Sequence, residues 1–119
     1  MTDSLLVQLR KGALDLCVLA MLAQQDGYAY DIASRLAQDI GMGEGTIYPL
    51  MRRMQADGLV KTYLEESSSG PPRKYYQLTR AGHAALAAQK AEWTSFVASV
   101  ARVLADNPTS SARTAGGAR

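Results

Sequence analysis

The side chains with the clearest capacity for chemistry are basic, and they gather in the middle of the sequence. Between residues 52 and 80, six lysines and arginines outnumber three acidic residues. This excess of positive charge would suit a polyanion, whose oxygens attract ammonium and guanidinium groups. Charge alone favours a simpler interpretation, which is a solvated surface. The basic residues are Arg52, Arg53, Lys61, Arg73, Lys74 and Arg80.

The residues needed for catalysis or metal binding do not occur in useful combinations. His83 is the single histidine and Cys17 the single cysteine, so they cannot supply a zinc site by themselves. No nucleophile–histidine–carboxylate pattern is present, and no spacing forces two carboxylates together. Gly41, Gly43 and Gly45 resemble a phosphate loop only superficially, because no Gly-Lys-Ser/Thr follows them. We therefore expect no enzyme activity, no metal and no cofactor.

Length and composition indicate one compact domain with an additional element. The chain has 119 residues, of which 47% are hydrophobic and 20% charged, close to an average globular protein. The longest apolar run, residues 13–23, contains Asp15 and is shorter than the ~20 residues that cross a bilayer. No secretory signal opens the chain, and Cys17 is expected to be a small buried residue. We therefore expect a cytoplasmic protein without membrane contact.

Apolar spacing and helix-breaking residues predict four helices and two strands. The first helix begins near residue 5 and ends before Gly27, which we interpret as a left-handed stop. A second helix covers about residues 28–39, and a third runs from residue 45 or 46 to 57, where Gly58 ends it. Residues 59–64 and 73–78 form a hairpin. Thr79 caps a last helix over residues 80–104, and residues 105–119 form a disordered tail.

The third helix separates an apolar face from an exposed one. The residues that recur at helical spacing on the core face are Ile47, Leu50, Met51 and Met54. The opposite face carries Gly45, Pro49, Arg52 and Ala56, flanked by Tyr48 and Arg53. If Thr46 caps this helix, Pro49 lies in its first turn, where the missing N–H of proline costs little.

Three helices followed by a hairpin is the order of a winged helix-turn-helix. We therefore predict a mainly α fold with a small β-hairpin, in which residues 1–78 form a DNA-binding domain. The third helix fits the major groove of duplex DNA, and the hairpin, or wing, lies along the neighbouring backbone. Each element has an alternative role in packing alone, and it is the complete order that favours DNA.

The last helix, residues 79–104, is predicted to make the protein a homodimer. Its apolar side chains form a wide stripe with coiled-coil spacing, and the helix is longer than one small domain can cover. A monomer would expose this stripe, which globular monomers rarely tolerate. The predicted interface residues are Leu86, Trp93, Phe96, Val97, Val100, Val103 and Leu104.

Four segments, in the right order, match the signatures of one family. The recognition helix is matched by GTIYPLMRRMQADGLV at residues 45–60, and the second wing strand by RKYYQLTRAG at residues 73–82. The openings of the first two helices are matched by LRKGAL at residues 9–14 and GYAYDI at residues 27–32. Together they resemble the PadR-like transcriptional regulators. The resemblance implies a dimeric DNA-binding regulator, often a repressor that a small-molecule effector releases.

The candidate DNA contacts follow from these positions. Thr46, Tyr48, Arg52 and Arg53 would enter or flank the major groove, and Lys61, Arg73 and Lys74 would hold backbone phosphates from the wing. Tyr28 and Tyr30 would donate hydroxyls to phosphates from the start of the second helix. Two tyrosines have structural alternatives, since the ring of Tyr48 could brace the turn and that of Tyr30 could pack in the core.

Two further alternatives remain open from the sequence. Trp93 could line the effector pocket, as the drug-responsive branch of the family implies, or belong to the dimer core, which we favour. The rival to DNA binding is a winged-helix protein-interaction module, which would grip a partner protein with the third helix or the wing. Salt separates the two, because counterion release makes DNA binding fall steeply as salt rises.

Overall fold

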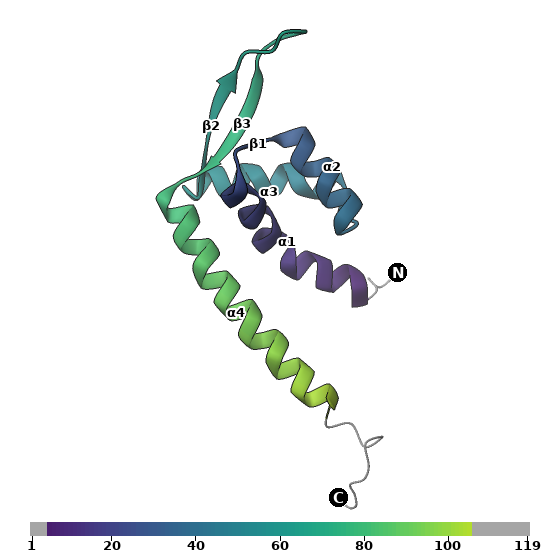
Figure 1. Ribbon diagram of the computed structural model, residues 1–119. Coiled ribbons are helices and arrows are strands. Elements are labelled where there is room, and N and C mark those ends of the chain that lie inside the picture. Colours follow the sequence, from purple (N-terminus) through teal and green to yellow (C-terminus); the bar gives the residue numbers. More distant parts are fainter. Residues whose placement is uncertain (1–4, 106–119) are drawn as a thin grey trace, which may run out of the picture. The chain divides into compact units, whose positions relative to one another are not determined.

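The computed structural model describes residues 5–105, apart from the side chain of Glu44, and confirms a mainly helical fold with a small sheet (Figure 1). The chain divides into two compact units, Met1–Ala87 and Ala88–Arg119. The predicted tail lies outside the described residues from residue 106 onward. In chain order the elements are α1 (Leu5–Gln24), β1 (Gly27–Tyr28), α2 (Ala29–Asp39), α3 (Glu44–Ala56), β2 (Val60–Glu65), β3 (Arg73–Leu78) and α4 (Arg80–Ala105).

The core of the first unit is built from one face of each helix and the inner face of the sheet. The predicted apolar face of α3 is confirmed, because its four residues are all buried. Removing such side chains from water stabilises the fold by roughly 1.5–3 kcal/mol each. The buried residues are Leu14, Val18, Leu19 and Leu22 of α1; Ile32, Ala33 and Leu36 of α2; Met42; Ile47, Leu50, Met51 and Met54 of α3; and Val60, Tyr76 and Leu78 of the sheet.

The sheet has three antiparallel strands in the order β1-β3-β2, one more than the predicted hairpin. The pairing of β2 with β3 runs from Val60 opposite Leu78 to Glu65 opposite Arg73. The additional strand β1 pairs Tyr28 with Tyr75. Figure 1 shows the hairpin of β2 and β3 extending beyond α2 and α3 as a wing.

Gly27 was expected to stop α1 in a left-handed conformation, and that expectation is wrong. Among the described residues, the left-handed glycines are Gly41, with φ of 82°, and Gly58, with φ of 78°, which follow α2 and α3. Gly27 lies in β1, where a Cβ atom would come within 2.7 Å of Ile32 Cδ1. A larger residue at this position would therefore have to displace the buried side chain of Ile32.

The start of α3 also differs from the prediction. The N-cap is Gly43, and Thr46 lies inside the helix with its backbone N–H donating to the Gly43 carbonyl at 3.1 Å. Pro49 consequently lies beyond the first turn, inside the helix. Because proline has no N–H, the carbonyl of Gly45 loses the donor that the helix would normally provide.

Thr79 joins the end of α3, the sheet and the start of α4. Its hydroxyl donates to the Gly58 carbonyl at 2.6 Å and accepts from the Gly82 N–H at 3.0 Å, which confirms the predicted cap. Gly82 is buried, and a Cβ atom there would meet the carbonyl oxygen of Leu59 and, at 2.7 Å, Leu78 Cδ2. The first turn of α4 is therefore packed directly on the backbone that follows α3.

The second unit contains the remainder of α4. From Ala88 to Ala105 nearly every residue is exposed, including the large apolar ones. Within residues 5–105, no helix combines the length and hydrophobicity that a membrane crossing requires.

Candidate nucleic-acid interface

On the exposed face of α3, Arg52 is the one long charged side chain, and the other residues of this face are small or uncharged. Gly45, Pro49, Arg52 and Ala56 are all exposed, as the helical spacing predicted. The guanidinium of Arg52 forms no ion pair with any other described residue. Its five N–H donors are therefore available to an external acceptor, such as a guanine edge or a phosphate.

The two neighbouring arginines of α3 have different surroundings. Arg53 Nη2 donates to Asp15 Oδ2 of α1 at 2.8 Å, and both side chains are about half exposed. A pair so exposed contributes little stability, so Arg53 can exchange this carboxylate for another anion. The sequence did not indicate Asp15 as a partner. Of the other candidates on α3, Thr46 is exposed and Tyr48 is half-buried.

Four tyrosines form a continuous cluster on the outer side of the sheet. The ring centroids of Tyr28 lie 6.4 Å from Tyr30 and 5.9 Å from Tyr75, and Tyr75 stacks on Tyr63 at 5.8 Å. Tyr30 is 53% exposed, so the alternative that placed it in the core is wrong. The hydroxyls of Tyr28 and Tyr30 are both predicted phosphate donors, and the structure brings their rings together at the start of α2.

Asp26 anchors this cluster, and the sequence did not single it out. Its Oδ2 accepts the hydroxyl of Tyr63 at 2.7 Å and the amide of Gln77 at 3.3 Å. The hydrogen bond to the Asp26 carboxylate is the main reason that the pKa of Tyr63 rises from 10.0 to about 12. The phenol therefore keeps its proton, and can donate it to Asp26, well into the alkaline range.

The predicted wing cations lie on two different faces. Side chains alternate along a strand, so Arg73 points to the outer face and Lys74 to the inner one. The guanidinium carbon of Arg73 is 5.0 Å from the ring centroid of Tyr28, and Lys74 Nζ is 5.7 Å from that of Tyr76. Lys61, paired with Gln77, shares the outer face with Arg73. All three cations are exposed.

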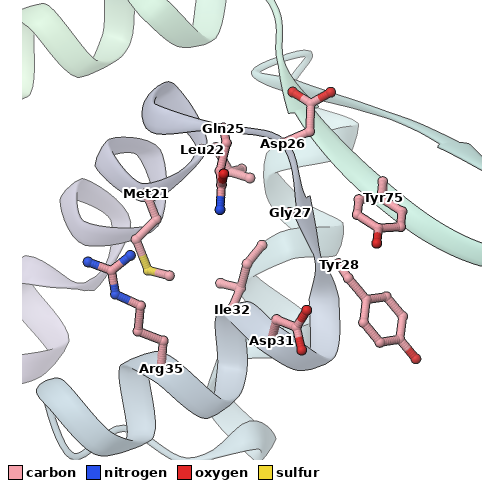
Figure 2. Close-up of a pocket in the computed structure, with 10 residues that line it drawn as sticks. All are labelled: Met21, Leu22, Gln25, Asp26, Gly27, Tyr28, Asp31, Ile32, Arg35 and Tyr75. Atoms are coloured by element: carbon pink, nitrogen blue, oxygen red, sulfur yellow. The ribbon is translucent and has the colours of Figure 1, made fainter. Parts of the chain in front are cut away.

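Two hollows lie beside these residues. One, of about 330 Å³, lies between the end of α1, β1 and the start of α2, and Figure 2 shows the side chains around it. It is lined by Met21, Leu22, Gln25, Asp26, Gly27, Tyr28, Asp31, Ile32, Arg35 and Tyr75; Trp93 is not among them. The other, also about 330 Å³, lies at the wing loop and is lined by Tyr28, Ser67, Ser69, Gly70, Pro71, Pro72, Arg73 and Lys74.

Most of the predicted dimer stripe is exposed on α4. Trp93 is 45% and Phe96 62% exposed, and Val97, Val100, Val103 and Leu104 are exposed as well. Leu86 differs, because it is half-buried and packs against the core of the first unit. At the start of α1, Leu5, Leu6 and Leu9 expose a further apolar surface, which the sequence indicated only as part of a helical pattern.

The part of the chain that the structure describes does not bring side chains together for metal binding or for nucleophilic chemistry. Residues 5–105 contain no group of three or more His, Cys, Asp or Glu side chains that could hold a metal ion. Cys17 is partly buried against the core, and burial raises the pKa of its thiol, which makes it a poorer nucleophile at neutral pH.

Known proteins share this sequence pattern and fold. The model of the Transcriptional regulator PadR-like family matches residues 18–88. A PadR-like transcriptional regulator from Bacillus cereus is 36% identical with a TM-score of 0.75, over 82% of this chain and 96% of that one. A PadR family regulator from Eggerthella lenta is 35% identical with a TM-score of 0.72, over 85% and 89%. Bacillus subtilis PadR, crystallised with operator DNA, has a TM-score of 0.59 at 22% identity, over 65% and 46%. Because the family model covers more than half of the sequence, this chain belongs to the PadR-like family of transcriptional regulators, which are DNA-binding winged helix-turn-helix proteins and not enzymes.

Proposed function

We propose that this protein is a transcriptional repressor that binds an inverted-repeat operator as a homodimer. The observation that carries the proposal is the exposed face of α3, where Arg52 has no ion-pair partner among the described residues. An α-helix fits the major groove, and a guanidinium there can donate two hydrogen bonds to guanine. Arg52 is thus the principal candidate for reading bases, and Thr46, Tyr48 and Arg53 flank it.

The wing holds the DNA backbone in this proposal. Arg73 and Lys74 line the hollow at the wing loop together with Ser67 and Ser69, so that cations and hydroxyl donors surround a space open to solvent. Phosphate oxygens accept hydrogen bonds from these groups without regard to base sequence. Lys61, Tyr28 and Tyr30 extend the same outer surface. Bacillus subtilis PadR, which shares this fold, was crystallised with operator DNA, and this supports DNA as the ligand.

The homodimer forms through α4 in this proposal. The exposed stripe that includes Trp93, Phe96 and Val100 is large enough to need cover, and a second copy supplies an identical face. A two-fold dimer would present two copies of α3 to successive major grooves, about 34 Å apart. The operator is then an inverted repeat.

A small-molecule effector completes the proposed regulation in the cytoplasm. The family resemblance supports an effector, and Trp93 is a candidate contact because its indole ring is substantially exposed. An effector that binds the free dimer more tightly than the DNA-bound dimer would release the operator, since coupling between two ligands is reciprocal.

Selection of bound duplexes from a random DNA pool tests the proposal. The expected result is one enriched motif with two-fold symmetry, bound with an affinity that falls steeply as salt rises. Binding without sequence enrichment would contradict operator recognition. An apolar protein partner whose binding is insensitive to salt, with no DNA bound, would favour the protein-interaction alternative.

A further inference from the structure

Gly45 stands out because nothing in the fold requires a glycine there. It lies in the first turn of α3 and does not have a left-handed backbone, unlike Gly41 and Gly58. A Cβ atom at Gly45 would meet no heavy atom within 4 Å, whereas one at Gly82 would collide with the backbone of Leu59. Alanine is the better helix former, so the missing side chain weakens α3 without improving its packing.

The position of Gly45 on α3 indicates why the lack of a side chain there could matter for function. Gly45, Pro49, Arg52 and Ala56 lie on the exposed face, at the spacing of successive turns. The two poorest helix formers thus sit together beside the unpaired arginine, and neither contributes to the core. Pro49 also leaves the carbonyl of Gly45 without its usual helical donor. The backbone of α3 is therefore bare and solvent-exposed at this point.

We propose that Gly45 is a specificity-determining position, at which the major-groove edge of a base pair packs directly against the backbone of α3. This inference rests on the proposed function, in which α3 enters the groove. Residues at the N-terminal end of a recognition helix are the ones that approach base edges. A methyl group at position 45 would hold the helix away from that base pair and misplace Arg52, while the phosphate contacts of the wing would remain.

Gly12 provides a matched control. It is also an exposed glycine inside a helix, and a Cβ atom there would likewise meet no heavy atom within 4 Å. Gly12→Ala and Gly45→Ala should therefore both raise the temperature of unfolding, because each replaces a poor helix former in open space. Only Gly45→Ala should affect DNA.

The experiment compares wild type, Gly12→Ala and Gly45→Ala on two duplexes of equal length. One is the duplex most enriched by the wild-type protein from a random pool, and the other has a scrambled sequence. Gly45→Ala should bind the enriched duplex roughly tenfold more weakly than wild type, the scale expected for forcing extra atoms into a close contact. Its affinity for the scrambled duplex should be unchanged, and Gly12→Ala should match wild type on both.

Each other outcome refutes a definite part of the inference. Wild-type affinity of Gly45→Ala for the enriched duplex would overturn the role of Gly45 and leave DNA binding intact. Equal losses on both duplexes would show that position 45 affects backbone contact rather than sequence reading. A Gly45→Ala variant that unfolds below the wild-type temperature would show that the glycine is structural. If wild type enriches no duplex, the proposed function fails together with this inference.

Discussion

Arg73 and Lys74 are adjacent in sequence, yet the geometry of β3 predicts that they act on separate phosphates. Arg73 lies on the outer face over Tyr28, and Lys74 lies on the inner face over Tyr76. Two side chains that leave a strand on opposite faces point in different directions, so each is expected to reach a phosphate group of its own. Replacing both with alanine should therefore remove two independent backbone contacts from each bound protomer.

The magnitude follows from counterion release. Each phosphate contact contributes about 0.9 to the slope of log affinity against log salt, so a fourfold rise in salt weakens binding about 3.5-fold per contact. Either single alanine variant should lose one such contact per protomer, and the double variant should lose both. Over the same fourfold rise in salt, the affinity of the double variant should therefore fall about 12-fold less per bound protomer than the affinity of wild type. The losses should add, because the two side chains share no partner.

Fluorescence anisotropy of a labelled duplex over a range of salt concentrations measures these slopes. Arg102→Ala is the charge-matched control, since Arg102 is an exposed cation in the last turn of α4. It should leave the slope unchanged. A double variant with the same slope as Arg73→Ala would show that only one of the two cations contacts DNA, and the assignment of both to phosphates would then be wrong.

Three further predictions concern other parts of the molecule. Arg52→Ala should weaken operator binding by about 1–3 kcal/mol and leave thermal unfolding unchanged, and an unchanged affinity would remove Arg52 from the interface. Val100→Asp should produce monomers in sedimentation experiments without unfolding the first unit, whereas an intact dimer would place the interface elsewhere. Tyr63→Phe should lower the unfolding temperature at neutral pH by removing the bond to Asp26. Because the folded pKa of Tyr63 is raised, that difference should persist below pH 10.0 and vanish as the pH passes about 12, and a difference independent of pH would contradict this cause.

Regular elements could be predicted because their periodicity is local. The buried face of α3 follows from apolar residues one turn apart, and β3 occupies residues 73–78 as expected. The strand β2 is shifted by one residue, to Val60–Glu65. The strand β1 could not be predicted, because two residues are too few to show an alternation of apolar and polar side chains. Its glycine also resembles a helix stop in sequence, although in the fold it leaves room for the side chain of Ile32.

The candidate site was predictable in its residue types but not in its pairings. Arg52 and Arg53 are neighbours of the same type, and only the fold shows that Arg53 meets Asp15, which is 38 residues away in the chain. The separation of Arg73 and Lys74 onto two faces follows from alternation along the predicted strand, but only the fold shows which ring each cation contacts. The N-cap at Gly43 was missed because glycine and threonine are both accepted N-cap residues, so residue type did not distinguish Gly43 from Thr46.

The Asp26 carboxylate has a consequence for how the wing folds and opens. It accepts hydrogen bonds from Tyr63 and Gln77, which are 37 and 51 residues away in sequence. Bringing such distant residues together costs loop-closure entropy, so we expect these contacts to form later than the local contacts within the helices. Once formed, they tie the segment before β1 to both other strands. Amide protons of Tyr75 and Tyr76 should therefore exchange with solvent together with those of the core helices, in one cooperative opening, rather than by independent fraying of the hairpin.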